Sequence, residues 1–565
     1  MANEIYNSSW WGDGVCDNTI GWGSSYKSIS NCSDASFSYA EASYAKDASN
    51  PTPTITGDAG GTFTATPAGL SINSSTGEIT LSTSTINSYT VKYTLSDGTF
   101  TTQTLGITAA SFSNVYSMDF DGVDDYIQTP TSTALDITGA MSVSLWMKDT
   151  YASNYNVMLS KDDGTGVRGW RIAAYSHWSG DNGIFAINNG ASVYTVACST
   201  TILDGNWHHL VFTYEPSVAL KVYRDGVLDG TNTTSIPASM DNDATVPITF
   251  GQTNNPPVGA GGWAYRGSLD EVSIYNSVLS ASDVTSIYNS GIPNDLSSIS
   301  GLTAWWRMGD NGSWKSPQFL LPENNNKDKV SNYSFDFDGI DDYITCSNFN
   351  SLASVNTFTV SFWAKFNTVA LNDTLLNHYS TLGFRADTQN NKMTFRWSSS
   401  DSTSVLVQST NTITTGTWKH YACTYDNTDF KLYENGALIS TTNEPSKTYR
   451  SNLNQNLLMG KYWFGLQRLF DGQLTQVAVW DSVQDVNAIY NGGEPTTITG
   501  ATNYWKMGED ATFSTNWTIP EAIGSSTGTS NAMTIEDRVG EAPNSSNNSL
   551  SYNMVEADRE TDVPS

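Results

Sequence analysis

Acidic side chains are the residues of this sequence whose types and spacing best suit chemistry. The segment SMDFDGVDDYIQ carries four of them, Asp119, Asp121, Asp124 and Asp125. A pair of carboxylates about 5 to 10 Å apart can cleave a glycosidic bond, and two or more can offset the dehydration of Ca²⁺. Asp is also common in turns, where its side chain caps the backbone. The cluster therefore suits a turn, a cation site or, least well, catalysis.

Catalytic patterns are absent elsewhere in residues 111–292 and 331–497. Glucanases of the jelly-roll type place their acids on one strand as ExDxE, and neither of these two segments contains such a triplet. The sequence also has no HxH or HExxH spacing for zinc and no phosphate loop. His209 and His420 each follow a Trp by two positions in an alternating segment, which favours hydrogen-bonded interior histidines. We therefore predict no catalytic residues and no enzymatic activity.

Composition limits the classes of partner. The chain has 565 residues and a formal net charge of −29, with only 15% charged residues. Nucleic-acid binding requires clustered Lys and Arg, so this balance argues against a nucleic-acid partner. No apolar run reaches the roughly 18 residues of a membrane span, and the start (MANEIYNSSWWGDG) lacks the pattern of a secretory signal. Five scattered cysteines form no CxxC pair and predict structural thiols.

A long internal repeat determines the domain organisation. SMDFDGVDDYIQ at 117–128 recurs as SFDFDGIDDYIT at 334–345, and GNWHHLVFTYE at 205–215 recurs as GTWKHYACTYD at 416–426. Further matched segments follow in the same order, up to DVTSIYNSG at 283–291 and DVNAIYNGG at 485–493. Two homologous domains are therefore expected, each much longer than a solenoid repeat.

Each copy is expected to be built from short β-strands. Apolar and polar residues alternate in runs bounded by Gly, Asn and Asp, which predicts an antiparallel β-sandwich. Asp225-Gly226 and Asn435-Gly436 predict tight hairpins because both turn positions favour positive φ. Short helices are expected at 281–288 and 483–490.

These motifs resemble those of the concanavalin A-like, laminin G-like jelly rolls. The FDGxDDY strand, the WHHxxxTY strand and the GxxDEVxIY strand occur in that order in the first copy, and the second copy matches until GQLTQVAVW. The weaker resemblance of GLSINSSTGEI is to small immunoglobulin-like modules. The fold class is therefore all-β. The expected parts are an anchoring segment (1–50), an Ig-like module (51–110), a first jelly roll (111–292), a linker (293–330), a second jelly roll (331–497) and a polar C-terminal segment (498–565).

The family resemblance implies a structural Ca²⁺ where the FDG strand meets the DEV strand. The expected ligands in the first roll are Asp119, Asp121, Asp270 and Glu271. The second roll has Thr475 and Gln476 in place of the last two, so we expect it to bind Ca²⁺ weakly or not at all. The alternative is that the acids are solvated turn residues with no ion.

The opening IYNSSWWGDG and the tandem rolls linked through WRMGD resemble virion structural proteins of tailed phages, particularly of marine hosts. The resemblance implies assembly in the host cytoplasm, partners among capsid or tail proteins, self-association and a host-surface glycan. The acidic balance and the lack of a membrane-length apolar run predict no nucleic-acid partner and no membrane insertion. Trp10, Trp11 and Trp22 are the expected anchoring residues. A secreted bacterial glycan-binding adhesin is the alternative, with an extracellular location, and a polysaccharide-active enzyme is a weaker one.

Glycan-binding residues are not assigned by the sequence. Six aromatic residues fall in expected loop or rim regions, where a flat ring can stack on a sugar: Trp170, Tyr175, Trp178, Trp397, Tyr462 and Trp463. Sandwich cores also use aromatic residues heavily, so core packing is the alternative for each.

Overall fold

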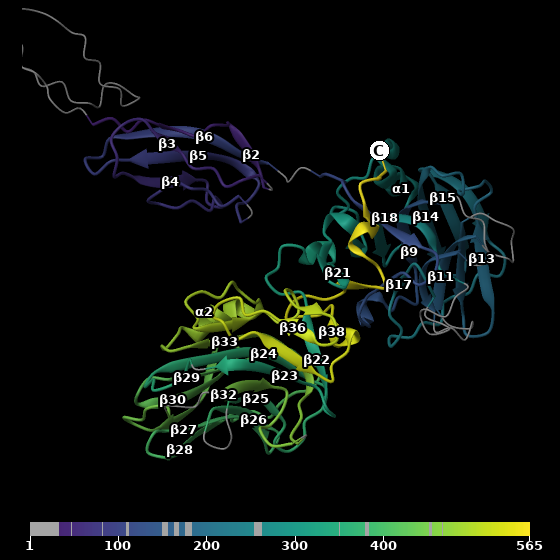
Figure 1. The fold of residues 1–565 in the computed structure, drawn as a ribbon. Helices are drawn as coiled ribbons and strands as arrows, with labels where there is room; N and C mark the ends of the chain where they lie inside the picture. Colours follow the sequence, from purple (N-terminus) through teal and green to yellow (C-terminus); the bar gives the residue numbers. More distant parts are fainter. Residues whose placement is uncertain are drawn as a thin grey trace, which may run out of the picture. The chain divides into compact units, whose positions relative to one another are not determined.

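The computed structural model describes residues 33–46, 48–81, 83–108, 112–149, 156–162, 169–175, 183–253, 263–349, 351–378, 383–450, 455–465 and 467–564. The chain divides into two units, Met1–Ser113 and Asn114–Ser565. Both units are built from strands (Figure 1). Within the described ranges, no helix has the length and apolar character needed to cross a membrane.

The first unit has a small β core. β2 (Ser43–Ala45), β6 (Phe100–Thr108), β5 (Asn87–Thr94) and β4 (Thr62–Thr66) form one sheet in that order, with β2 parallel to β6. β1 (Phe37–Ser38) pairs with β3 (Thr54–Ile55). Phe37 stacks edge-on against Phe63, so residues 37–45 belong to this core although the sequence placed them in the anchoring segment. Its Ig-like character stays a prediction.

The first jelly roll consists of two facing sheets. One runs in the order β16 (Val227–Asn232), β15 (Ala219–Arg224), β14 (Trp207–Glu215), β9 (Met141–Lys148), β18 (Arg266–Tyr275), β7 (Ser117–Asp121) and β40 (Arg559–Glu560), with β19 (Leu302–Trp306) also beside β18. The nine-stranded sheet runs in the order β13 (Val193–Ala197), β12 (Ile184–Asn188), β11 (Gly169–Tyr175), β10 (Asn156–Asp162), β17 (Thr249–Phe250), β8 (Tyr126–Gln128), β39 (Ser549–Tyr552), β21 (Gln318–Leu321) and β20 (Ser313–Lys315).

The second jelly roll repeats this arrangement strand for strand. Its first sheet runs in the order β31 (Ala437–Asn443), β30 (Asp429–Glu434), β29 (Lys419–Tyr425), β24 (Phe358–Phe366), β33 (Asp471–Trp480), β22 (Ser334–Asp338) and β38 (Arg538–Val539), with β34 (Asn503–Trp505) beside β33. Its nine-stranded sheet runs in the order β28 (Ser404–Gln408), β27 (Lys392–Ser398), β26 (Arg385–Gln389), β25 (Thr374–His378), β32 (Gln455–Met459), β23 (Tyr343–Phe349), β37 (Gly528–Asn531), β36 (Trp517–Ile519) and β35 (Thr512–Phe513).

Each roll buries the inward faces of its two sheets against one another, because alternate side chains on those strands are apolar. Trp306 and Trp505 occupy corresponding places in the two cores. The hairpin prediction is confirmed, since Asp225 and Asn435 both have φ of 50°. The helices are α1 (Ala281–Tyr288), as expected, and α2 (Val486–Tyr490), which begins three residues later than the sequence suggested.

Short 3-10 turns complete the secondary structure that the described residues show. They lie at Thr133–Leu135, Asn289–Gly291, Met308–Asp310, Asn324–Asn326, Asn491–Gly493, Ile535–Asp537 and Glu556–Asp558.

The C-terminal residues complete both rolls. β36, β37 and β38 close the second roll, and in Figure 1 the yellow β38 lies beside the teal β22. The chain then returns to the first roll, where β39 pairs with both β8 and β21 and β40 pairs with β7. The second roll is thus inserted in sequence between β21 and β39 of the first.

The structure contains strands in two segments for which the sequence predicted none. Residues 293–330, expected to be a linker, carry β19, β20 and β21 of the first roll. Residues 498–565, expected to be a polar segment, carry β34 to β40. The strands escaped notice because each has only two to five residues, too few to show an alternating pattern.

Candidate functional site

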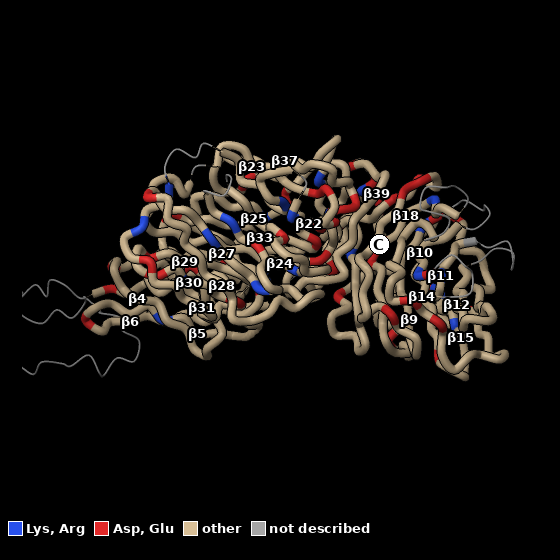
Figure 2. Tube along the Cα trace, turned by 90° about the horizontal axis from the view of Figure 1, so that it is seen from below, with Lys and Arg blue, Asp and Glu red and all other residues tan. Residues whose placement is uncertain are grey.

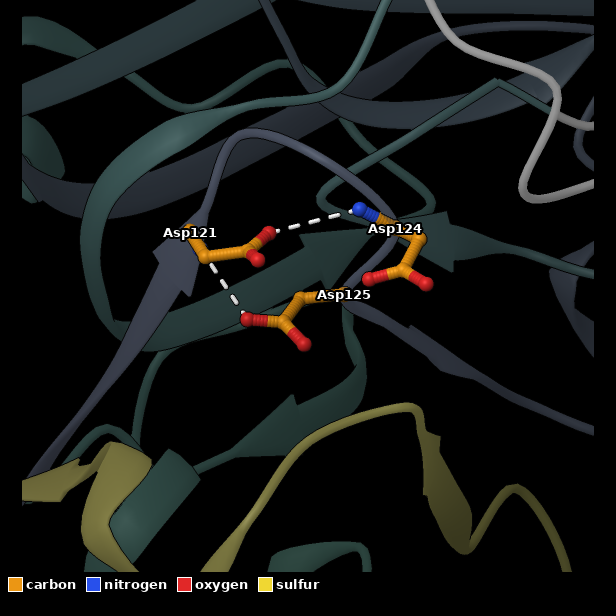
Figure 3. Close-up of side chains that lie close together, drawn as sticks. All are labelled: Asp121, Asp124 and Asp125. Carbon is orange, nitrogen blue, oxygen red and sulfur yellow. Dashed lines mark hydrogen bonds between the residues drawn. The ribbon is translucent and has the colours of Figure 1, made fainter.

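The FDGxDD segment forms a tight acidic turn after β7. The Asp121 carboxylate accepts hydrogen bonds from the backbone N–H groups of Val123 and Asp124, at 2.7 and 3.3 Å. The Asp125 carboxylate accepts one from the N–H of Asp121 at 3.0 Å (Figure 3). Carboxylate oxygens of Asp121, Asp124 and Asp125 all lie within 4.8 Å of one another. The turn therefore uses its acids as caps and still gathers three carboxylates.

The charge of this turn is reinforced by the C-terminal segment. Burial raises the pKa of Asp125 to about 7, and the charges of Asp121, Asp558 and Asp124 add to the shift. Burial and the charges of Asp119 and Asp121 also raise the pKa of Asp558, which precedes β40. A fourth carboxylate therefore faces the turn from a segment more than 400 residues away in sequence.

The second roll carries an equivalent acidic turn. The Asp338 carboxylate accepts from the N–H groups of Ile340 and Asp341, at 2.7 and 3.1 Å. Burial and the charge of Asp537 raise the pKa of Asp342 to about 7. Asp537 occupies the place that Asp558 has in the first roll, so the two turns have the same electrostatic character.

Asp270 and Glu271 do not join the acidic turn, contrary to the predicted ligand set. They form a separate, buried cluster with Asp310. The reason is a bulge in β18: its register against β9 shifts between Asp270 and Ser273, and Glu271 has φ of 47°. Strict alternation, on which the prediction relied, fails at a bulge.

This buried cluster is internally satisfied. Glu271 accepts from the indole N–H of Trp305 at 2.6 Å and from Nε of Arg307 at 3.0 Å. Asp270 accepts from Nδ2 of Asn114 at 2.8 Å, and Asp310 accepts from the backbone N–H of Val115 at 3.0 Å. Burial raises the pKa of Glu271 to about 7, against the opposing charge of Arg307. These acids are therefore part of the interior hydrogen-bond network of the sandwich.

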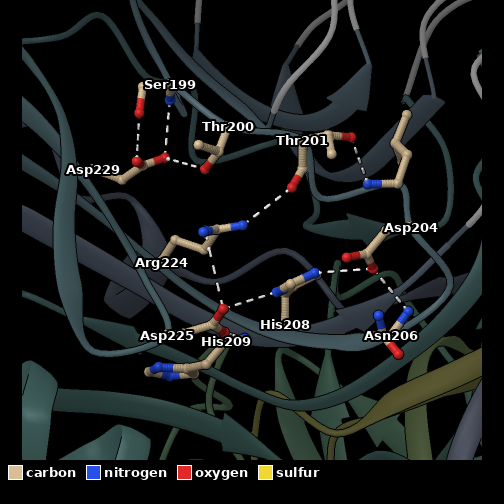
Figure 4. A network of polar contacts seen from close by, with 11 residues as sticks. Ser199, Thr200, Thr201, Asp204, Asn206, His208, His209, Arg224, Asp225 and Asp229 are labelled. Carbon is tan, nitrogen blue, oxygen red and sulfur yellow. Dashed lines mark hydrogen bonds and ion pairs between the residues drawn. The ribbon is translucent and has the colours of Figure 1, made fainter.

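A polar network surrounds His208, the second residue of β14 (Figure 4). Nδ1 lies 2.8 Å from Oδ2 of Asp225, and Nε2 lies 3.1 Å from Oδ1 of Asp204. The hydrogen bond to Asp225 is the main cause of a raised His208 pKa. Both ring nitrogens are engaged by carboxylates, so His208 has no nitrogen left to activate a hydroxyl group.

His209 and His420 are interior histidines, as predicted. His209 lies 2.8 Å from the Ser144 hydroxyl and His420 lies 2.7 Å from that of Ser361. Burial lowers the pKa of both histidines to about 3, so both are neutral at physiological pH.

An arginine projects from the outer face of the nine-stranded sheet in each roll. Arg171 on β11 is paired with Ser160, and Arg385 on β26 is paired with Asn377. Ser160 and Asn377 each follow a leucine paired with the last residue of β17 or β32. The two arginines therefore occupy the same position of the fold.

Each of these arginines lies between a carboxylate and an aromatic ring. In the first roll, Arg171 lies 2.8 Å from Asp162 and its guanidinium carbon is 5.1 Å from the Trp263 ring centre. In the second, Arg385 lies 2.7 Å from Asp387 and 5.0 Å from the Tyr462 ring centre. The loop between β17 and β18 supplies Trp263, and the loop between β32 and β33 supplies Tyr462. An aromatic face beside fixed polar groups is the arrangement that a sugar ring requires.

The aromatic residues singled out from the sequence fall into different settings. Trp170 and Trp397 are buried in the two cores, so the packing alternative holds for them. Tyr462 is half-buried and contacts Arg385 of the second sheet face, and the next residue, Trp463, is 38% exposed. The Tyr175 side chain and Trp178 lie outside the described residues, as do the expected anchors Trp10, Trp11 and Trp22.

Sequence reasoning missed the two arginines, Trp263 and the acids of the C-terminal segment. A signal existed for the last of these. The pattern MxxxDRxx[E/D]xP occurs twice at an offset of 21 residues, beginning at Met533 and at Met554. It places Asp537 and Asp558 at the two acidic turns. The arginines had no such signal because distant strands bring their partners together.

Comparisons with known proteins agree with the architecture. The family model of the concanavalin A-like lectin/glucanase superfamily matches residues 121–285 and 337–489. The chain belongs to this family, and its two matches coincide with the two jelly rolls. No curated protein matches the sequence.

Several solved structures are similar to this chain at low sequence identity. A putative carbohydrate-binding protein from Bacteroides ovatus is 14% identical, with 73% of this chain and 95% of that chain covered and a TM-score of 0.32. Domains LG4-5 of the mouse laminin alpha1 chain are 11% identical, with 70% and 95% covered and a TM-score of 0.24. Domain 4 of an arabinanase from Geobacillus stearothermophilus, solved with arabinotriose, is 22% identical, with 32% and 83% covered and a TM-score of 0.25.

Proposed function

We propose that the protein is a non-enzymatic attachment protein that binds glycans through the outer faces of its two nine-stranded sheets. The observation that carries this proposal is the arginine held between a carboxylate and an aromatic ring at the same position of both rolls. Two such faces in one chain provide two attachment points on one surface.

The absence of catalysis is part of the proposal and is supported by the roles of the acids. Asp121 and Asp338 cap backbone N–H groups of their own turns. Glu271 is tied to Arg307 and Trp305 inside the sandwich. A glycosidase needs one carboxyl as an acid and a second as a nucleophile or base on either side of the scissile bond. Carboxylates used as caps and interior ion pairs serve neither role.

The glycan proposal is tested by retention of the full chain on gels that contain dextran, laminarin, alginate or carrageenan. Trp263→Ala should weaken retention on a polysaccharide bound by the first roll by about tenfold, and Tyr462→Ala should do the same for one bound by the second roll, since an aromatic anchor commonly contributes more than ~1 kcal/mol. Phe100→Ala, which removes an exposed ring in the other unit, should leave it unchanged.

Unchanged retention of the Trp263→Ala, Tyr462→Ala double variant would mean that the outer sheet faces do not bind the polysaccharide. Release of new reducing ends from any of the four polysaccharides would contradict the non-enzymatic part of the proposal.

We also propose Ca²⁺ as a structural ligand, at the acidic turns of both rolls. Each turn gathers three carboxylates within 4.8 Å, and their mutual repulsion fits a divalent cation. Asp121 and Asp125 would hold the ion in the first roll, with Asp338 and Asp342 in the second. The equivalence of the turns removes the reason to expect binding in the first roll alone, because Asp270 and Glu271 are engaged elsewhere.

Stability in the absence of Ca²⁺ should therefore increase as the pH falls from 8 to 6.5. Asp125 and Asp342 have pKa values of about 7 in the folded protein, against about 3.9 when unfolded. The folded chain thus takes up protons that the unfolded chain does not, so acid stabilises it over this range. His209 and His420 have an ordinary pKa of about 6.5 in the unfolded chain, so they take up protons there over the lower part of this range and increasingly below it, which opposes the gain.

Calcium at pH 8 should have a similar effect and raise the melting temperature by roughly 3 to 6 °C. The Asp125→Asn, Asp342→Asn double variant should lose most of the calcium effect and part of the pH effect. Scanning calorimetry with calcium or chelator measures both. An unchanged melting temperature on addition of calcium would leave these acids as turn residues only.

The location that we propose is the virion of a tailed phage, on the resemblance of the opening segment and the tandem rolls. Trp10, Trp11 and Trp22 would anchor the chain to capsid or tail proteins. Purified particles that lack the chain would contradict this location.

A further inference from the structure

We propose that the outer sheet face of the second jelly roll selects an acidic saccharide, one that carries carboxylate or sulfate groups. The inference rests on the proposed glycan-binding function and adds the chemical class of the ligand. It comes from a cluster of three arginines, Arg385, Arg396 and Arg468, around one carboxylate.

The cluster is built from paired strands and one loop. Arg385 on β26 is directly opposite Arg396 on β27. Nε of Arg385 lies 2.7 Å from Oδ2 of Asp387, and Nη2 of Arg396 lies 3.0 Å from Oδ1 of the same residue. Asp387 is fully buried, and each of its two carboxylate oxygens lies next to one of these two arginines.

Arg468 brings a third positive charge without an acid of its own. Its guanidinium carbon is 4.5 Å from the Tyr462 ring centre, on the ring that Arg385 also contacts. Within the part of the chain that the structure describes, no carboxylate forms an ion pair with Arg468. The positive charge of Arg468 acts to lower the pKa of both Arg385 and Asp387, so the three residues interact electrostatically.

The local charge balance is therefore three cations to one anion, in a chain with a formal net charge of −29. Figure 2 shows how few Lys and Arg positions the molecule has, with several of them by β25 and β27. Like charges placed close together and partly removed from water cost free energy unless an anion joins them. A bidentate carboxylate or a sulfate is the partner that guanidinium groups match best.

The surroundings suit a saccharide rather than a free inorganic anion. Tyr462 is half-buried, and the next two residues, Trp463 and Phe464, are 38% and 71% exposed. These consecutive residues expose aromatic surface in the loop that brings Tyr462 to the arginines, and a pyranose face can stack on such surface. A small anion would gain nothing from these rings.

Among the described residues, the first roll lacks the extra charges at this place. Ala186 is opposite Arg171, where the second roll has Arg396, and Asp162 lies 2.8 Å from Arg171. Its equivalent face therefore suits an uncharged sugar, and selection for acidic sugar belongs to the second roll.

The test measures binding of the full chain to fluorescent oligosaccharides of alginate (carboxylated), carrageenan (sulfated) and dextran (uncharged). Wild-type protein should bind at least one acidic oligosaccharide, more weakly as salt increases. Arg468→Gln and Arg396→Gln should each weaken that binding by roughly tenfold or more, since hydrogen bonds to charged groups are the strong ones. Both side chains are partly exposed, so the variants should fold, and thermal melting checks this.

Lys431→Ala is the matched control because it removes one positive charge from the other sheet of the same roll, where Lys431 pairs with Asp426. It should leave binding of the acidic oligosaccharide unchanged, and none of the three variants should alter binding of dextran by the first roll.

The outcomes separate this inference from the proposed function. Binding of dextran alone, or acidic binding that survives both Arg variants, overturns the acidic selectivity and leaves glycan attachment in place. Loss of acidic binding in Lys431→Ala as well would show a response to net charge and also overturn it. No binding to any of the three oligosaccharides, nor to laminarin, overturns both.

Discussion

A chain that ends after Asn548 is expected to lose most of the stability of its first jelly roll. The truncation removes β39, which lies between β8 and β21, and β40, which pairs with β7. It also removes the buried Leu550 and Met554. Each lost core side chain costs about 2 to 5 kcal/mol, and two sheets lose strand pairing. The melting transition of the first roll should fall by more than about 10 °C.

Calorimetry of the truncated chain should show this fall in one transition, while the second roll, which keeps β36 to β38, melts as before. A chain that ends after Asp562 is the control, since it retains both closing strands and the ion pair between Asp562 and Lys148. Equal melting of the two truncated chains would mean that the C-terminal strands add nothing to the first roll.

The second large effect is expected from Arg307→Ala. Arg307 is the cation that faces two buried acids, with Glu271 at 3.0 Å and Asp310 at 3.4 Å. Its removal takes away the main counter-charge of these carboxylates and Asp270, and leaves only the smaller effect of Arg559 on Asp310. Breaking a buried pair in this way costs about 3 to 5 kcal/mol. Chemical denaturation of the full chain at pH 8 should show this loss in the first roll.

The second roll supplies a matched control. Lys506 occupies the place of Arg307, and its one ion pair among the described residues is with the partly exposed Asp510, at 3.3 Å. Lys506→Ala should therefore cost less than about 1 kcal/mol. Addition of Glu271→Gln, the residue type found at Gln476, should recover much of the stability that Arg307→Ala loses. Equal costs for the Arg307 and Lys506 variants, or no rescue, would contradict the assigned charge cluster.

The tandem rolls, their hairpins and their first helix could be predicted because the signals are local or repeated. Asp225-Gly226 predicts a turn because of the backbone preferences of these two residues alone. The long repeat predicts two similar domains even when the pairing of their strands is unknown. The closing strands could not be found in this way. β40 has two residues and gains its conformation from β7, more than 400 residues earlier in the sequence.

The predicted cation site stays a prediction, but the structure separates two of its expected ligands, Asp270 and Glu271, from Asp121. Asp121 does lie in an acidic cluster, but the bulge at Glu271 turns Asp270 and Glu271 into the sandwich. A bulge depends on the register of neighbouring strands, which alternation along one strand does not reveal. Arg171 and Arg385 were missed for a related reason, since their carboxylate and aromatic partners come from other strands and loops.

Hydrogen–deuterium exchange of the full chain, with and without the oligosaccharide that it binds most tightly, tests the central claim most directly. The account predicts slower exchange in the strands that carry the two arginines and in their neighbours, β10 and β11 or β25, β26 and β27, with no change in β14 or β29. Protection confined to the acidic turns at 121–125 and 338–342, or to the eight-stranded sheets, would contradict the claim that the outer faces of the nine-stranded sheets bind the sugar.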